Sequence, residues 1–241
     1  MEFRCAARTH ADSDPIDKRD TAVIRDAATI LVLRHDLPGG TAVLMGQRGT
    51  QAAFMPAKFV FPGGAVDDDD AQVRLGAPPD ADSLRRLGSN AHALAAAAIR
   101  ELWEETGLIL GRPGHWPDPP AAWRDFAASG FLPDASGLRH VFRAITPAGR
   151  SRRFDARFFV LDARHLRSDP DDFSRAGSEL SLLQWVPLTA ARHLDLPFIT
   201  EVVLAEVQAL LDQSPSGAQI TPASVPFFDT RGARPVFARI S

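Results

Sequence analysis

One predicted helix with glutamates at its end constrains this chain more than any other segment. Ser89 or Asn90 can cap a helix that runs through an alanine-rich stretch to Thr106, and Gly107 is suited to end it. Positions i, i+3 and i+4 of a helix share a face. The end of this helix therefore presents three carboxylates on one side: Glu101, Glu104 and Glu105.

This glutamate cluster is unfavourable unless its charge is compensated. The helix dipole disfavours negative charge in the last turn, and like charges at these spacings repel by roughly a few tenths of a kcal/mol per pair. An ordinary solvated helix face is the alternative interpretation. A bound divalent cation would remove both penalties, and carboxylate ligands suit Mg²⁺ or Mn²⁺.

Short apolar runs on both sides of this helix predict the strands of a sheet, because turn-forming residues separate them. The runs are 27–33, 41–45, 58–61, 108–110, 140–145, 154–161 and 182–186. Apolar residues at helical spacing predict a second long helix from Pro197 to Leu211, and weaker patterns predict short helices near 82–87 and 121–128.

The order of these segments predicts a single domain at residues 25–228. Residues 1–24 are polar and lack periodicity, so we interpret them as a flexible N-terminal arm. An acidic segment at about 71–90 and a proline-rich segment at 111–137 are interpreted as insertions. Residues 229–241 are interpreted as a C-terminal tail.

The bulk properties exclude several classes of partner. A formal net charge of −3 gives no broad basic field, so we predict no nucleic-acid partner. No apolar stretch approaches the roughly 18 residues of a membrane helix, and the N-terminus has no apolar signal core. Together with the single Cys5, this predicts a cytoplasmic protein without a membrane partner. Whether the chain forms a homodimer is left open.

The nine residues from Arg100 to Leu108 resemble the second half of the Nudix box. The first half of that box begins with a glycine and has an acid six residues later, positions that Gly64 and Asp70 occupy. Residues 71–99 separate the two halves, which is 22 residues more than usual. A similarly interrupted box occurs in a branch that resembles the peroxisomal coenzyme A diphosphatases, and an inserted loop costs little closure entropy.

The resemblance implies an α/β fold, the Nudix fold, in which a mixed sheet lies between helices in an α/β/α sandwich. It also implies a metal site with four ligands: Gly64 through its carbonyl, Glu101, Glu104 and Glu105. Arg100 would orient this cluster by pairing with Asp70. Glu179 is the candidate for a further ligand or general base supplied by a later loop.

The implied reaction is the hydrolysis of a diphosphate by a metal-dependent hydrolase. The metal ions would neutralise the diphosphate oxygens and lower the pKa of a bound water, and a glutamate would accept its proton. Glu104 and Glu179 are both candidates for this base. The histidines lack metal-ligand spacing, and His92 and His140 are interpreted as capping or surface residues.

Coenzyme A or an acyl derivative is the leading candidate substrate. Arg48 lies thirteen residues before Phe61, where coenzyme A-cleaving members of the family have an arginine. The other positions of that signature are not kept, so ADP-ribose, dinucleotides and nucleotide sugars stay open. A basic cluster on a predicted hairpin is interpreted either as a phosphate-binding edge or as a solvated hairpin: Arg150, Arg152, Arg153 and Arg157. A nucleotide-binding protein without catalytic activity is the alternative from another class.

Overall fold

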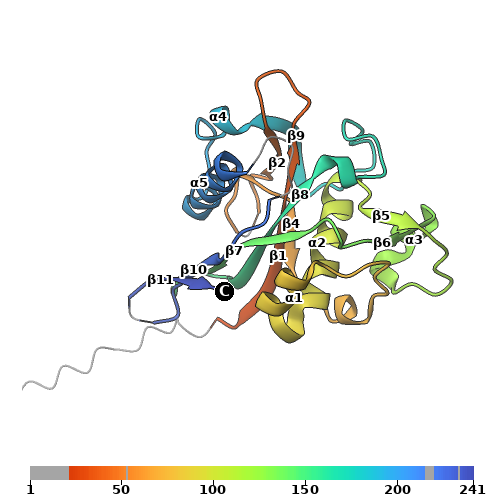
Figure 1. Cartoon of the computed structure of the whole chain (residues 1–241), viewed down its shortest axis with the longest axis horizontal. Coiled ribbons are helices and arrows are strands. Elements are labelled where there is room, and N and C mark those ends of the chain that lie inside the picture. The colour runs from red at the N-terminus through yellow and green to blue at the C-terminus, as the bar shows by residue number, and fades with distance from the viewer. Residues whose placement is uncertain (1–21, 53, 215–219, 233) are drawn as a thin grey trace, which may run out of the picture.

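A mixed sheet forms the centre of the protein (Figure 1). The computed structural model describes residues 22–52, 54–214, 220–232 and 234–241. The strands of the sheet are β1 (Ile24–Arg34), β2 (Ala42–Arg48), β3 (Phe59–Val60), β4 (Gly63–Ala65), β7 (Arg139–Ile145), β8 (Arg153–Asp162), β9 (Leu180–Pro187), β10 (Val225–Asp229) and β11 (Val236–Ile240). They follow the order β11-β10-β7-β8-β1-β2-β3, with β4 paired to β1 and β9 paired to β2.

The position of β1 at the centre of the sheet explains why its sequence is a continuous apolar run. It pairs with β8 in parallel from Ile24 to Leu33, and its other edge pairs antiparallel with β2 and β4. Its side chains alternate between two hydrophobic cores: Ile30 lies in one core and Leu31 in the other, and both are fully buried. A strand that is buried on both faces needs apolar residues at successive positions.

Helices cover both faces of the sheet (Figure 1). On one face lie α1 (Ala81–Leu87) and α2 (Ala91–Thr106), and on the other lie α4 (Leu188–Ala191) and α5 (Phe198–Gln213). The predicted α/β/α sandwich with a mixed sheet is therefore confirmed. Alanines 95–98 of α2 have no exposed surface, because their small side chains let the helix lie close to the sheet.

The sequence predicted the C-terminal end of α2 correctly, but it did not predict how the N-terminal end is capped. Gly107 is the predicted C-cap, with a left-handed φ of 75° and an N–H that donates to the Trp103 carbonyl. Asn90 stands at the N-cap position, yet its side chain donates to Asp26 on β1 and caps no backbone group of the helix. The preceding residues form a 3₁₀ turn, η3 (Gly88–Asn90).

The insertion inside the box is a folded element that docks on the sheet. It contains the end of η2 (Asp68–Gln72) and the helix α1, which the sequence predicted as a short helix. Asp80 caps α1 by accepting hydrogen bonds from the N–H groups of Asp82 and Ser83. The Ser83 hydroxyl in turn accepts a hydrogen bond from the His140 N–H on β7.

The proline-rich segment is also folded. It forms η4 (Ala121–Trp123) and α3 (Arg124–Ala128), which confirms the helix predicted at 121–128, between the paired strands β5 (Gly111–Pro113) and β6 (Phe131–Pro133). The predicted strand at 108–110 is wrong. These residues are buried, but their backbone groups bond to loops: the Ile109 N–H donates to the Ser168 hydroxyl, and the Leu110 carbonyl accepts from Asp134.

The predicted boundaries of the domain need correction at both ends. The prediction that residues 229–241 form a tail outside the domain is wrong, because β11 pairs with all five residues of β10 and forms the edge of the sheet. Six residues, 230–235, separate β11 from the end of β10, which is longer than the two- to five-residue loops by which a hairpin is recognised from pattern alone. At the other end β1 begins at Ile24, which therefore belongs to the domain. The remainder of the predicted arm, residues 1–21, lies outside the described residues.

No helix in the described part of the chain is long and apolar enough to cross a membrane.

Candidate active site

The candidate site lies where β4 meets the C-terminal half of α2. Gly63 and Gly64 of β4 pair with Thr29 and Ala28 of β1. A Cβ on Gly64 would lie 2.4 Å from a carboxylate oxygen of Glu101, so any side chain there would displace the glutamate. Glycine at this position lets the carboxylate of the helix lie directly against the backbone of the strand.

Arg100 holds the two halves of the interrupted box together. Its Nε and Nη2 each donate to one oxygen of Asp70 at 3.0 Å, and Nη2 also donates to the Ala65 carbonyl at 2.9 Å. Its Nη1 donates to Glu101 at 2.9 Å and to Glu104 at 3.0 Å. The predicted pairing of Arg100 with Asp70 is confirmed, although the shorter aspartate stands where the family has glutamate.

This pairing takes place away from solvent. Asp70 is fully buried and Arg100 is only 4% exposed. Burial alone would lower the pKa of Arg100, but the hydrogen bond to Asp70 and the charges of Glu101 and Glu104 raise it. The guanidinium therefore stays charged and fixes the orientation of the carboxylates around it.

The glutamates carry more negative charge than Arg100 can balance. Burial raises the pKa of Glu101 to about 7, although Arg100 opposes the shift. Burial also raises the pKa of Glu104, and it raises that of Glu105 well above its ordinary value, with a further contribution from Glu101. One Glu105 oxygen accepts from the Gly63 N–H at 2.8 Å, while the other is buried without a hydrogen-bond partner.

These features fit a divalent cation at an open site. In the described part of the chain, no three His, Cys, Asp or Glu side chains are placed so that they could together hold a metal ion. Glu101 and Glu104 turn towards Arg100, and Glu105 turns towards Gly63. The donors are all oxygens, one of them unpartnered, and Mg²⁺ characteristically uses few protein ligands and keeps several waters. The residues present therefore suit such an ion.

Pairing of β2 with β9 brings the two other predicted residues to the site. Arg48 ends β2 opposite Leu180, so the preceding Glu179 lies beside it, and the Arg48 guanidinium donates to Glu179 at 2.6 Å. The charge of Glu179 raises the pKa of both Glu101 and Glu105. Arg48 and Glu179 are thus close enough to influence the cluster electrostatically.

Gly177 is a site residue that the sequence reasoning missed. Its N–H donates to the Glu104 carbonyl at 2.8 Å, and a Cβ there would lie 2.5 Å from that oxygen. This contact ties the loop before Glu179 to the end of α2. A glycine two residues before a candidate acid is the signal that could have found it, since glycine permits close backbone approach.

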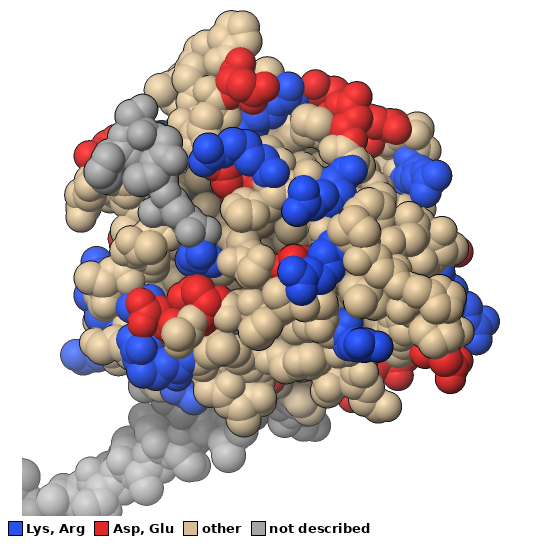
Figure 2. Space-filling model, turned by 45° about the vertical axis from the view of Figure 1, so that its right-hand side comes forward, with Lys and Arg blue, Asp and Glu red and all other residues tan. Residues whose placement is uncertain are grey.

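A hollow of about 1160 Å³ lies next to Glu104. The proline-rich segment supplies one wall, which includes Asp125, and the loop before β9 supplies another, which includes Asp172 and Arg175. Trp123 and Phe126 are fully buried, and Phe126 contacts Trp103 of α2, so the wall is anchored to α2. Figure 2 shows acidic and basic side chains interspersed on one face of the molecule, without one large basic region.

Arg157 of the basic hairpin pairs with Ala28 but donates to Asp26 and to the Asp155 carbonyl, and Arg152 and Arg153 are not brought to the glutamates. Arg153 pairs with Ile24, four residues along β1 from Ala28, which pairs with Gly64. That separation is about 13 Å along the strand. Arg153 donates to the Thr146 carbonyl and is buried, whereas Arg152 is exposed. Their role in binding phosphate stays a prediction.

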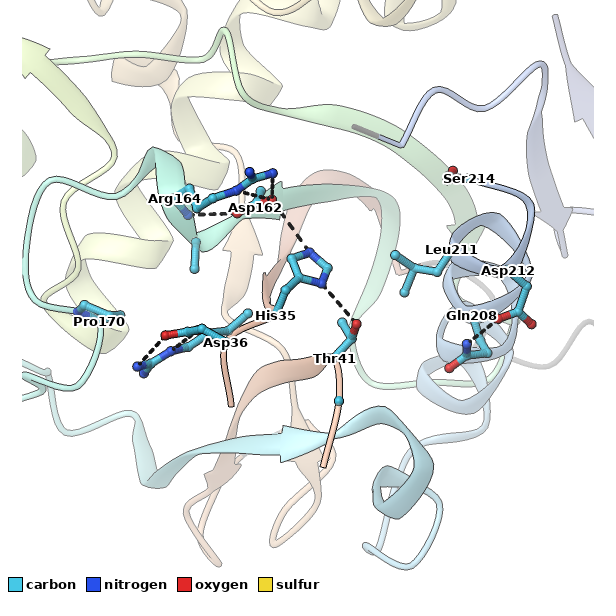
Figure 3. A pocket seen from close by; sticks show the side chains of 13 residues that line it. His35, Asp36, Thr41, Asp162, Arg164, Pro170, Gln208, Leu211, Asp212 and Ser214 are labelled. Atoms are coloured by element: carbon cyan, nitrogen blue, oxygen red, sulfur yellow. Dashed lines mark hydrogen bonds and ion pairs between the residues drawn. The ribbon is translucent and has the colours of Figure 1, made fainter. Parts of the chain in front are cut away.

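A second pocket, of about 760 Å³, lies at the C-terminal end of β1, next to Arg34 (Figure 3). His35 lies between the Thr41 hydroxyl, 3.0 Å from Nδ1, and the Asp162 carboxylate, 3.6 Å from Nε2. Two arginines of this pocket already have carboxylate partners: Arg34 with Asp36, and Arg164 with Asp162. We assign no function to this pocket.

Comparison with known proteins agrees with this geometry. The model of the NUDIX domain matches residues 23–207. The chain is 30% identical to a NUDIX hydrolase from Alicyclobacillus acidocaldarius, whose crystal structure superposes with a TM-score of 0.64 over 84% of this chain and 100% of that chain. The protein therefore belongs to the Nudix hydrolase family.

Two curated relatives add detail. The chain is 33% identical to "Putative nudix hydrolase 7" of Caenorhabditis elegans over 60% of this chain and 46% of the relative. It is 29% identical to acyl-coenzyme A diphosphatase NUDT19 of Gallus gallus over 67% of this chain and 60% of the relative. The chain thus spans only about half of the length of these relatives. Nudix hydrolases generally use divalent metal ions.

Proposed function

We propose that this enzyme cleaves the diphosphate bond of coenzyme A or an acyl-coenzyme A, with Mg²⁺ or Mn²⁺ as its cofactor. The observation that carries the metal-dependent reaction is the buried carboxylate cluster around Arg100, whose charge one guanidinium leaves uncompensated. A divalent cation would neutralise this charge and the diphosphate oxygens together.

The residues divide into ligands and orienting groups. The Gly64 carbonyl, Glu101, Glu104 and Glu105 would hold the metal, which supplies charge neutralisation and acidifies a water. Arg100 keeps Glu101 and Glu104 in place through the hydrogen bonds of its Nη1. Its bidentate contact with the buried Asp70 prevents the guanidinium from turning away.

Glu104 is our candidate for the general base. Its side chain is 40% exposed, so water reaches it, and burial of the remainder raises its pKa, which makes the carboxylate a stronger base. Glu179 is the second candidate, but its carboxylate is paired with Arg48. If Glu104 is the base, Glu104→Gln will lower kcat far more than Glu179→Gln. The reverse order would assign the base to Glu179.

The arrangement of arginines supports coenzyme A as the substrate. Arg48 lies beside the cluster and can contact the diphosphate, while Arg152 and Arg153 lie about 13 Å further along the sheet. The segment that follows Arg48 reaches this region, because Phe54 contacts Phe154 at 5.5 Å between ring centroids. Coenzyme A has a further phosphate on its ribose, distant from the scissile bond, that this basic edge could bind.

The test is a product-release assay with Mg²⁺ or Mn²⁺ on coenzyme A, an acyl-coenzyme A, ADP-ribose, a dinucleotide and a nucleotide sugar. We expect the highest kcat/KM for a coenzyme A substrate. Arg152→Ala should lower kcat/KM for coenzyme A about tenfold. Because ADP-ribose lacks the extra phosphate, kcat/KM for ADP-ribose should stay within about twofold of the wild-type value. Higher kcat/KM for ADP-ribose, a dinucleotide or a nucleotide sugar would refute the coenzyme A assignment and retain the reaction type.

A further inference from the structure

The outermost strand β11 presents an open hydrogen-bonding edge. Among the described residues it pairs with β10 alone. Pro226 of β10 lies opposite Arg239 and has no N–H, so the ladder bonds must fall on the neighbouring pairs, such as Phe227 with Ala238. The backbone N–H and C=O groups of Phe237 and Arg239 therefore point outward, away from β10.

This edge also carries exposed apolar side chains. Val236 is 57% exposed and Phe237 is 58% exposed. The ring of Phe237 contacts Phe228, which contacts Phe198 at the start of α5, and Phe198 is 69% exposed. Contiguous exposed aromatic surface of this kind is typical of an interaction site.

Some of the features that usually protect an edge strand are missing from β11, although the strand is short and carries one exposed charged side chain, Arg239. Its five residues include no proline and no lysine, and its register with β10 is regular. We propose that a second copy of this chain covers the edge, with the two β11 strands antiparallel about a two-fold axis through Ala238. The two sheets would then form one continuous sheet.

The sequence of β11 is complementary to itself in this register. Phe237 lies opposite Arg239 of the partner subunit, and the outward backbone groups of these residues can exchange hydrogen bonds. A guanidinium over a phenylalanine ring is favourable, and the same sheet already contains such a pair, Arg143 over Phe227 at 4.4 Å. Val236 lies opposite Ile240 of the partner subunit, which is an apolar pair on the other face. An isologous contact of this type closes as a dimer.

The first test is the mass of the chain in solution over a range of concentrations. We expect a species of twice the mass of one chain. Phe237→Lys places two like charges opposite each other and should weaken the dimer at least tenfold. Phe237→Glu places an acid opposite Arg239 and should weaken it clearly less. Both variants remove the same ring, so any difference between them reports the sign of the new charge and not the loss of apolar contact. Thermal unfolding of each variant checks that the fold is retained.

Cross-linking tests the register independently of stability. In a Cys5→Ser background, Ala238→Cys places two thiols directly opposite each other, within reach of a disulfide, and should give a dimer that a reductant separates. Arg239→Cys is the matched control, because its two copies are about 8 Å apart between Cα atoms, beyond disulfide reach.

A monomer at all concentrations would overturn the proposal, and so would a dimer that Phe237→Lys leaves intact. Equal weakening by Lys and Glu, or equal cross-linking at 238 and 239, would overturn the register. A monomer that dimerises only when residues 1–21 are removed would show that this segment, and not a second copy, covers the edge. None of these outcomes depends on the substrate of the enzyme.

Discussion

Two regions of the molecule gather charged side chains, and they balance them in opposite ways. At the pocket around His35, the carboxylates that pair with the arginines are exposed or half-buried: Arg34 donates to Asp36 at 2.9 Å and to Asp171 at 2.6 Å, and Arg164 lies 2.7 Å from Asp162. Hydrogen bonds from Arg34 lower the pKa of Asp36, so the ionised form of this carboxylate is stabilised. At the Nudix box, the single Arg100 donates hydrogen bonds to three acids, Asp70, Glu101 and Glu104, and lies 3.7 Å from a fourth, Asp67.

The difference lies in burial and in the number of charges. Glu101 and Glu105 are 9% and 3% exposed, and burial raises the pKa of both. Exposed ion pairs such as that of Arg164 contribute little to stability, whereas buried charge without a partner is costly and persists where function requires it. Unbalanced buried charge, and not the number of charged residues, therefore marks the candidate catalytic site.

The largest expected effect is on turnover. Glu104→Gln should lower kcat by about 100-fold or more, because it removes both a ligand oxygen and the candidate base. Asp162→Asn, the matched change in the other pocket, should leave kcat within about twofold. The assay uses the best substrate with Mg²⁺ at saturation. If both variants keep full activity, the distinction between the two regions fails.

The next effect concerns stability. Arg100→Ala leaves Asp70 buried without its partner, which should cost about 3–5 kcal/mol in the free energy of unfolding. Arg164→Ala removes the ion pair with Asp162 from an arginine side chain that is 71% exposed, and should cost less than about 1 kcal/mol. Urea unfolding followed by circular dichroism measures both. Equal losses in the two variants would contradict the contrast in burial.

A divalent metal should stabilise the protein by binding at the Nudix box and not at the pocket around His35. At a Mg²⁺ or Mn²⁺ concentration 100 times its Kd, the free energy of unfolding should rise by about 2.7 kcal/mol, and a chelator should reverse the gain. Glu105→Gln should abolish most of this gain, and Asp36→Asn should keep it. Thermal unfolding with and without metal gives the comparison. A gain that survives Glu105→Gln and disappears in Asp36→Asn would reverse the assignment of the metal site.

The pH dependence of the metal-free protein should have opposite signs in the two regions. The pKa of Glu101 rises from 4.5 to about 7 on folding, so its contribution is fully present below pH 4.5 and is lost as the pH rises through 7. Glu101→Gln should flatten this loss, whose slope is at most about 1.4 kcal/mol per pH unit. The pKa of Asp162 is lowered by Arg164 against the effect of burial, so Asp162→Asn should reduce stability only above about pH 3.8. Chemical unfolding in a chelator across this range tests both signs.

The sequence predicted the parts of the fold that depend on local patterns. The apolar run of β1, the end of α2 at Gly107 and the two long helices are all confirmed. The pairing of Arg100 with Asp70 was also predicted, because the resemblance to the Nudix box implies it and each half of the box keeps its own internal spacing.

The parts that failed depend on contacts between distant segments. His140 was expected to be a cap or a surface residue, yet it is 1% exposed against Phe159, and burial lowers its pKa to about 3. Residues 108–110 have the composition of a strand, but Ser168 and Asp134 bond to their backbone instead. The approach of Gly177 to Glu104 depends on a loop whose path no local pattern specifies.

The most direct test of the central claim is a calorimetric titration of the metal-free protein with Mn²⁺. The buried, uncompensated glutamates predict a site in the wild type whose affinity falls at least tenfold in Glu105→Gln and is unchanged in Asp162→Asn, with both variants folded. Equal Mn²⁺ affinity in the wild type and in folded Glu105→Gln would contradict the claim that this cluster holds the metal.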